Sequence, residues 1–224
     1  MRSLFSYDSK FGQVMGFITD VILLNLLFLV CCIPIVTIGA AQSGLYYAVR
    51  TLRDPEDGRS CYKLFFKGFV SGFWRITLVW CAFLVIDAVL FYTMWVSFEN
   101  QALGIFIHWG VPCAGLILSL LLHSLTTIFH SQFDCTAGQL FRNTVLLFAT
   151  NPFHSIVVGV LTWAPLVLAG FNIVTFVDLI PLFVAVYYSL ALLVNSTVMK
   201  KPFQNLINHM DEDEVEEREE ITED

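Results

Sequence analysis

Charged residues are scarce in this chain. They make up 14% of its 224 residues, whereas hydrophobic residues make up 57%. Soluble domains carry about 25% charged and about 45–50% apolar residues, so the composition excludes an ordinary soluble protein. The apolar residues occur in runs of about 20, the helix length that crosses a hydrocarbon core of about 30 Å. These runs lack the alternation of barrel strands, so we predict an all-α, polytopic membrane protein.

The sequence also lacks motifs for catalysis, nucleotide binding and metal binding. It has no Walker motif, no Gly-rich phosphate loop, no Ser/His/Asp triad, no CxxC and no His/Glu metal cluster. Six cysteines are present, and free cysteine packs as a small hydrophobe. No basic patch of the kind that binds nucleic acid is present. We therefore expect no enzymatic activity, no cofactor, no metal ion and no nucleic-acid partner.

The negative charge is concentrated at the C-terminus. Ten of the 19 acidic residues lie in residues 211–224 beside one arginine, so this segment carries −9 and the rest of the chain +2. A segment so polar cannot bury enough apolar surface to fold alone. We predict a membrane helix bundle over residues 1–202, followed by a disordered, acidic cytoplasmic tail over residues 203–224.

The hydrophobic runs predict a bundle of six spans, with five as the alternative. The six are residues 12–33, 34–53, 76–98, 103–129, 153–170 and 174–198. The second is the doubtful one, because it is short; without it the count is five. Its Gly39, Ala40, Ser43 and Gly44 allow close helix approach, which favours a place inside the bundle. Two further stretches, residues 61–73 and 136–151, have the pattern of amphipathic interfacial helices on the cytoplasmic side.

The positive residues favour six spans over five. With six, every Lys and Arg of residues 1–202 falls on one side of the membrane, as the positive-inside rule requires of the cytoplasmic side. With five, Arg2 and Lys10 move to the opposite side. We therefore predict a multi-pass protein of the cell membrane with both termini in the cytoplasm.

Polar residues inside the spans are the candidate functional residues. Asp87 lies at the centre of the span 76–98, where an ionisable group is expensive and is usually paired or functional. The following span carries a polar stripe at helical spacing, formed by Gly115, Ser119, His123, Thr126 and His130. An Asp87–His123 pair could relay protons, bind a polar substrate or only fix helix packing. Asn25, in the middle of the first span, is expected to bond across to another helix.

Most of the chain resembles a known family, and the specific part of the resemblance is an N-terminal motif. Its order is Asn25-Leu-Leu-Phe-Leu, then Cys32-Ile-Pro34-Ile-Val-Thr37-Ile-Gly39-Ala, then a basic stretch and Leu64-Phe-Phe-Lys67-Gly-Phe69. This order is similar to the YesL-like family of small integral membrane proteins from Gram-positive bacteria. The biochemical function of that family is not established, and the resemblance supplies no catalytic residues. The genes of the family tend to lie beside sugar ABC importers and glycan-degrading enzymes, which implies a role in carbohydrate uptake.

Two functional hypotheses follow from these observations. The first is a non-enzymatic accessory or permease-like component of oligosaccharide ABC uptake, with the lipid bilayer, ABC transporter subunits and a sugar substrate as partners. The second is an autonomous secondary transporter or channel that uses the Asp87/His123 pair and works as a homo-oligomer.

Overall fold

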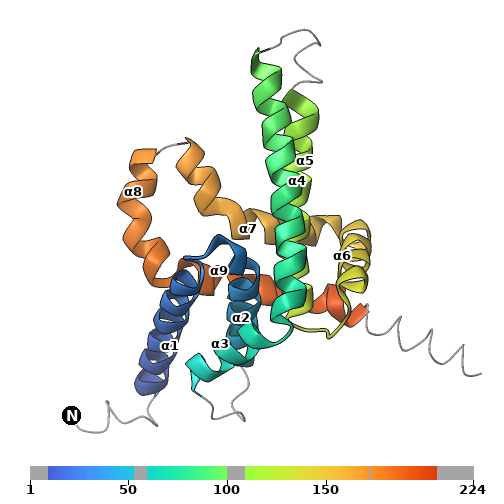
Figure 1. The fold of residues 1–224 in the computed structure, drawn as a ribbon. Helices are drawn as coiled ribbons and strands as arrows, with labels where there is room; N and C mark the ends of the chain where they lie inside the picture. Colours follow the sequence, from blue (N-terminus) through green and yellow to red (C-terminus); the bar gives the residue numbers. More distant parts are fainter. Residues whose placement is uncertain (1–9, 53–59, 100–108, 172, 206–224) are drawn as a thin grey trace, which may run out of the picture.

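The computed structural model describes residues 10–52, 60–99, 109–171 and 173–205, and within these ranges every regular element is helical (Figure 1). The all-α prediction is therefore confirmed. The elements are α1 Lys10–Cys31, η1 Ile35–Thr37, α2 Ile38–Thr51, α3 Cys61–Val70, α4 Phe73–Glu99, α5 Val111–His130, α6 Ala137–Thr150, α7 Pro152–Phe171, α8 Ile173–Leu182, the π-helical turn η4 Phe183–Tyr187 and α9 Tyr188–Val198.

Three of the described helices, α1, α4 and α5, are long and apolar enough to cross a membrane. A fourth span results if α6 and α7 count as one, although they meet at 111°. This count of three to four is smaller than the predicted six or five. The difference arises because α2 has only 14 residues and because the predicted span 174–198 is divided by η4 into two short helices.

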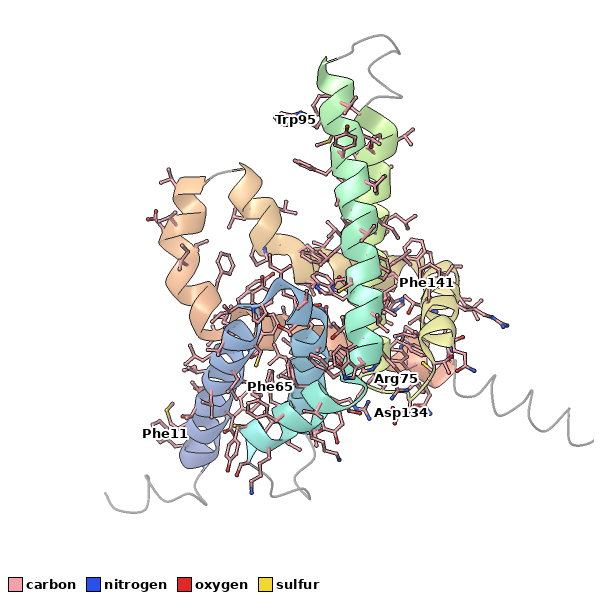
Figure 2. All side chains as sticks on the ribbon, in the orientation of Figure 1. Phe11, Phe65, Arg75, Trp95, Asp134 and Phe141 are labelled. Carbon is pink, nitrogen blue, oxygen red and sulfur yellow. The ribbon has the colours of Figure 1, made fainter. Side chains whose placement is uncertain are left out.

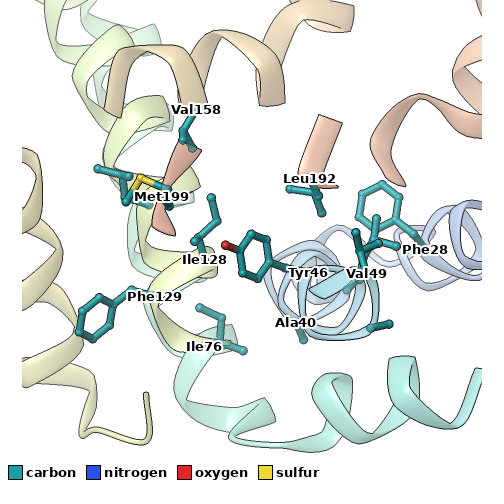
Figure 3. Packing of buried hydrophobic residues seen from close by; sticks show 14 of the residues in the cluster. Phe28, Ala40, Tyr46, Val49, Ile76, Ile128, Phe129, Val158, Leu192 and Met199 are labelled. Carbon is teal, nitrogen blue, oxygen red and sulfur yellow. The ribbon is translucent and has the colours of Figure 1, made fainter. Parts of the chain in front are cut away.

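Helix α2 occupies the interior of the molecule, as its small residues predicted. Ten of its 14 residues are buried, from Gly39 to Val49. In Figure 3, Tyr46 of α2 lies near Ile76 of α4 and Ile128 of α5. Tyr46 is only 1% exposed. Since α2 contacts α1, α3, α4, α5 and α9, it is the element on which the others assemble.

The two amphipathic stretches form the short helices α3 and α6, as expected. The buried residues of α3 are Cys61, Leu64, Phe65 and Gly68, and the helix packs against α2 and α1, while Lys63 and Lys67 are exposed. Helix α6 begins at a capping box in which Thr136 and Gln139 bond reciprocally, an arrangement that satisfies backbone donors of the first turn. Pro152 opens α7, where its missing N–H is no loss.

Helices α4 and α5 form an antiparallel hairpin that extends beyond the other helices (Figure 1). Figure 2 places Arg75 at the end of α4 near α3 and Trp95 toward the opposite end. Val89, Tyr92 and Trp95 are each more than half exposed, as side chains directed at lipid would be. Residues 103–108 of the predicted span 103–129 lie outside the described residues.

The C-terminal boundary of the bundle lies later than predicted. The sequence assigned Phe203 to the tail, but its side chain is 4% exposed and its ring lies 6.1 Å from that of Phe129 and 5.7 Å from that of Phe133. The hydrophobic core therefore includes at least Phe203. The acidic residues of the predicted tail lie outside the described residues.

Candidate functional site

Polar side chains join α2 to α5 at two places and to the segment just after α5 at a third. Gln42 Oε1 lies 3.0 Å from His123 Nε2, and Ser43 Oγ lies 3.0 Å from His130 Nδ1. Farther along, Gln132 Nε2 donates to the Tyr46 hydroxyl over 3.3 Å. Because Gln42, Ser43, His123 and His130 are all at least nine-tenths buried, these bonds satisfy groups that would otherwise be costly inside the protein.

His123 lies in an aromatic enclosure. Its ring centroid is 4.1 Å from that of Trp80, 5.9 Å from that of Phe83 and 5.7 Å from that of Trp163. Trp163 is itself held on α5, because its Nε1 donates to Leu120 O and to Ser124 Oγ. The imidazole is therefore packed on several sides and bonded by Gln42, which is the environment of a structural histidine.

The structure does not bring Asp87 and His123 together in a hydrogen bond. The contacts along the hairpin fix its register, because Phe83 touches His123 and Leu90 lies against Gly115. Asp87 lies between Phe83 and Leu90, so its level on α5 is that of Ser119. The predicted Asp87–His123 pair is thus replaced by a His123–Gln42 pair.

Asp87 and Ser119 share an unusual property. The buried Oδ1 of Asp87 and the buried Oγ of Ser119 both lack a hydrogen-bond partner among the residues that the structure places. Ser119 is 5% exposed, so its hydroxyl is enclosed within the protein. Unpartnered polar atoms of this kind are rare in folded proteins. The candidate intramembrane polar site is therefore Asp87 with Ser119.

Asn25 makes the cross-helix bonds that its position predicted. Its Nδ2 donates to Phe183 O over 2.9 Å, and its Oδ1 accepts from the backbone N of Ser189 over 3.2 Å. Phe183 begins the π-helical turn η4, in which regular i−4 hydrogen bonding is interrupted. Asn25 is fully buried and ties α1 to this irregular turn, so its amide has a packing role.

The motif residues Pro34, Thr37 and Gly39 shape the break between α1 and α2. Thr37 Oγ1 donates to Cys31 O and to Pro34 O over 2.6 and 2.8 Å, and Trp80 Nε1 donates to Ile35 O over 2.7 Å. A Cβ on Gly39 would lie 2.9 Å from Trp80 Cβ. Glycine at this position therefore lets α4 approach the start of α2.

A polar cavity that the sequence did not predict lies where α2, α3 and α5 meet. We call it the junction cavity; it has a volume of about 250 Å³. Its lining includes Ser43, Lys67, Ser71, His130, Gln132 and Asp134. The stripe on α5 pointed to His130, but its partner Ser43 lies 87 residues away in the chain. No local sequence pattern predicts a contact between residues so far apart in the chain.

An ion pair lies beside the junction cavity, and one of its partners, Asp134, lines the cavity. Arg75 Nη2 donates to Asp134 Oδ1 over 3.0 Å, and Arg75 Nη1 donates to Cys135 O over 2.8 Å (Figure 2). Gly72, just before α4, has a φ of +64°, a conformation that glycine adopts at little cost. A Cβ there would also clash with His130 Nε2, so glycine makes room for the imidazole.

The described residues contain no cluster of three or more His, Cys, Asp or Glu side chains that could hold a metal ion. All six cysteines are free. Helix α2 thus makes the polar contacts to α5. Among the described residues, buried polar atoms without a partner occur at Asp87 and Ser119, at His130 Nε2, at Thr77 and at Asn195.

Comparison with known proteins gives one match. Residues 21–94 match the family model described as "Protein of unknown function, DUF624". The match covers about a third of the chain and includes Asn25, Pro34 and Asp87, but neither Ser119 nor His123. No curated protein and no solved structure matches the chain. The chain is therefore similar over residues 21–94 to an uncharacterised family, a finding consistent with the YesL-like resemblance.

Proposed function

We propose that this protein is a non-enzymatic, permease-like or accessory component of oligosaccharide ABC uptake in the cell membrane, in which α3 receives a partner ATPase. The chain carries no ATP-binding motif, so the ATPase is a separate subunit. The similarity of residues 21–94 to an uncharacterised family assigns no activity of its own. The proposal takes its substrate class from the YesL-like resemblance and its mechanism from the way α3 is attached.

The observation that carries the proposal is the tight contact between α3 and α2. A Cβ on Gly68 would lie 2.6 Å from Tyr47 Cβ and 3.0 Å from Gly44 Cα. The two glycines therefore face each other, and the helix backbones touch without intervening side chains. Because α2 bonds in turn to His123 and His130 of α5, displacement of α3 is transmitted to the buried helices.

The outer face of α3 offers a docking stripe. Tyr62, Phe66 and Val70 recur every four residues and are 45%, 45% and 66% exposed, so they lie along one side of the helix. The two lysines of α3 are also exposed. An apolar stripe flanked by cations is suited to a groove with acidic edges on a partner, a helix-in-groove mode of recognition.

The proposed topology has six spans and cytoplasmic termini, with α3 and α6 on the cytoplasmic side. Its support is the distribution of Lys and Arg along the sequence. Cysteines introduced at Ser3 and Thr222 test it on intact cells with an impermeant thiol reagent. Neither position is expected to react; labelling at Ser3 alone would indicate five spans.

Affinity purification from native membranes in mild detergent tests the partnership. An ABC ATPase subunit is expected to accompany the wild-type protein and to be lost from Phe66→Ser. Phe153→Ser is the matched control, because Phe153 on α7 is also exposed, at 74%, but lies away from α3. Absence of an ATPase from the wild-type preparation, or equal recovery with Phe66→Ser, would contradict the proposal.

A second candidate function rests on the Asp87/Ser119 level. Two buried oxygens without partners on facing helices are the kind of group that a small transporter or channel uses for a proton or a polar substrate. This function predicts flux into liposomes that contain the purified protein alone, and loss of that flux in Asp87→Asn. Flux that requires an added ATPase would favour the first candidate.

A further inference from the structure

The junction cavity is lined by charges of both signs. Lys67 of α3 and Asp134, in the segment after α5, are the charged residues of its lining. They do not pair with each other. Within the described part of the chain the Lys67 ammonium forms no ion pair, and the Asp134 carboxylate is paired with Arg75, which does not line the cavity. The lining therefore holds one cation and one anion apart.

The Lys67 ammonium keeps hydrogen-bond donors for a ligand. Its Nζ lies 5.3 Å from the centroid of the Tyr47 ring, a cation–π contact that attracts the charge without supplying a conventional acceptor. An ammonium carries three donors, and Lys67 is exposed, so a ligand can reach it. Lys67 is thus able to donate to an anionic oxygen inside the cavity.

The Asp134 carboxylate is held in place and still accepts hydrogen bonds. Arg75 donates to its Oδ1 over 3.0 Å and to the neighbouring Cys135 carbonyl over 2.8 Å, which fixes the position of this segment. A carboxylate has about four acceptor sites on its two oxygens, and the Asp134 side chain is 83% exposed. Asp134 can therefore accept from an ammonium group that enters the cavity.

Several uncharged polar groups of the lining are already used within the protein. The Ser43 hydroxyl is bonded to His130 Nδ1, and the Gln132 amide donates to the Tyr46 hydroxyl. A neutral polyol needs many such groups as partners, whereas a ligand with both charges needs chiefly the two charged residues. The lining therefore favours a ligand that carries a cation and an anion.

The cavity lies where two candidate spans end. The span Val111–His130 ends at His130, which lines the cavity, and the span of α4 begins at Phe73, two residues after Ser71, which also lines it. A helix of about 20 residues crosses the hydrocarbon core, so the ends of these spans lie at the depth of the lipid headgroups. A phospholipid headgroup is thus the dipolar group that this cavity meets first.

We propose that the junction cavity binds an ethanolamine phosphodiester, either as the headgroup of a phospholipid or as a soluble compound of the same chemistry. Lys67 donates to the phosphate oxygens, and Asp134 accepts from the ethanolamine ammonium, so both contacts are charge-assisted. The volume of about 250 Å³ is below the range of about 300–1,000 Å³ found for drug-sized ligands, as suits a single headgroup.

The test uses the full-length protein in a neutral detergent, with thermal unfolding followed against ligand concentration. The probes are glycerophosphoethanolamine, which is soluble, and dihexanoyl phosphatidylethanolamine. Ethanolamine hydrochloride and sodium dimethyl phosphate, at matched ionic strength, present the ammonium and the phosphodiester separately. The ethanolamine phosphodiesters are expected to raise the melting temperature of the wild type, and the two separate halves are not, because the cavity binds through both charges at once.

Variants of the two charged lining residues identify the site. Lys67→Gln and Asp134→Asn are each expected to weaken the dissociation constant about tenfold or more, the effect of losing one charge-assisted hydrogen bond. Lys63→Gln and Asp178→Asn are the matched controls, because they make the same changes at exposed residues that do not line the cavity. Phe66→Ser, which alters the docking stripe, should bind the probes like the wild type, so the site is tested independently of the uptake proposal.

The pattern of stabilisation distinguishes the two sources of the ligand. Stabilisation by glycerophosphoethanolamine supports a soluble ligand, and stabilisation by the phospholipid alone supports a headgroup. The proposal is overturned if neither probe stabilises the wild type more than ethanolamine and dimethyl phosphate added together. It is also overturned if the control variants weaken binding as much as Lys67→Gln and Asp134→Asn, because that result indicates general attraction to surface charge.

Discussion

Gly68 of α3 lies so close to α2 that replacing its hydrogen with a methyl group is expected to separate the two helices. The added Cβ would meet Tyr47 Cβ at 2.6 Å and Gly44 Cα at 3.0 Å. Neither atom can rotate away, because one is backbone and the other is attached directly to it. The clash in Gly68→Ala must therefore be relieved by movement of a whole helix.

The expected loss of stability follows from two opposing terms. Overpacking a close contact costs about 1–3 kcal/mol, whereas Gly→Ala inside a helix returns about 0.5–1 kcal/mol. The net change in the free energy of unfolding is a loss of up to about 2.5 kcal/mol, centred at about 1 kcal/mol. For a chain of this size, the melting temperature falls by about 2–4 °C per kcal/mol. We expect Gly68→Ala to melt several degrees below the wild type in detergent.

Gly16→Ala on α1 is the matched control. It makes the same chemical change within a helix, but a Cβ there meets no atom within 4 Å, so only the favourable helix-propensity term remains. The two variants should shift the melting temperature in opposite directions. If Gly68→Ala melts at or above the wild-type temperature, the close contact between α2 and α3 is not as tight as described, and the transmission path from α3 to α5 loses its basis.

Three further predictions concern other buried groups. Gln42→Leu leaves the His123 imidazole unpaired and should cost about 1–3 kcal/mol in thermal unfolding, part of which the double variant with His123→Leu should restore. Asp87→Leu should melt at or above the wild-type temperature, because it removes a buried carboxylate oxygen that has no partner; a large fall would reveal an essential contact. Burial raises the pKa of the Cys61 thiol to about 11, so the reactive thiolate forms only as pH approaches that value. At pH 8 a maleimide should label Cys61 far more slowly than a cysteine at exposed Ser60, and equal rates would contradict its burial.

Local sequence signals predicted the helices that depend on local chemistry. The small residues of α2 indicated an interior helix, and Pro152 indicated the start of α7, since both effects act within a turn or two. The predicted span 174–198 is divided by the π-helical turn η4, and one contact at that turn comes from a residue far away in the chain. Asn25 on α1 donates a hydrogen bond from its side chain to the Phe183 carbonyl, at the π-helical turn that divides that span.

The candidate site shows the same limit. Hydropathy placed Asp87 and His123 on neighbouring spans, but it contained no information on how the antiparallel helices are offset. An offset of one helical turn places Asp87 at the level of Ser119 instead of His123. His123 is then hydrogen-bonded to Gln42. The junction cavity was hidden for a related reason. Its Ser43, Lys67 and His130 come from three helices, and each looks ordinary on its own.

The side-chain bonds at the break between α1 and α2 bear on the thickness of bilayer that can surround this protein. Helix α2 rises about 21 Å over its 14 residues, about 9 Å less than a typical hydrocarbon core. In the proposed six-span topology, in which α2 crosses the membrane, the break can therefore lie below the headgroups. Irregular backbone is stable there only when its polar groups are hydrogen-bonded within the protein. The side chains of Thr37 and Trp80 donate such bonds to three backbone carbonyls of the break. A bilayer of ordinary thickness can thus enclose the short helix without thinning and without admitting water to the break.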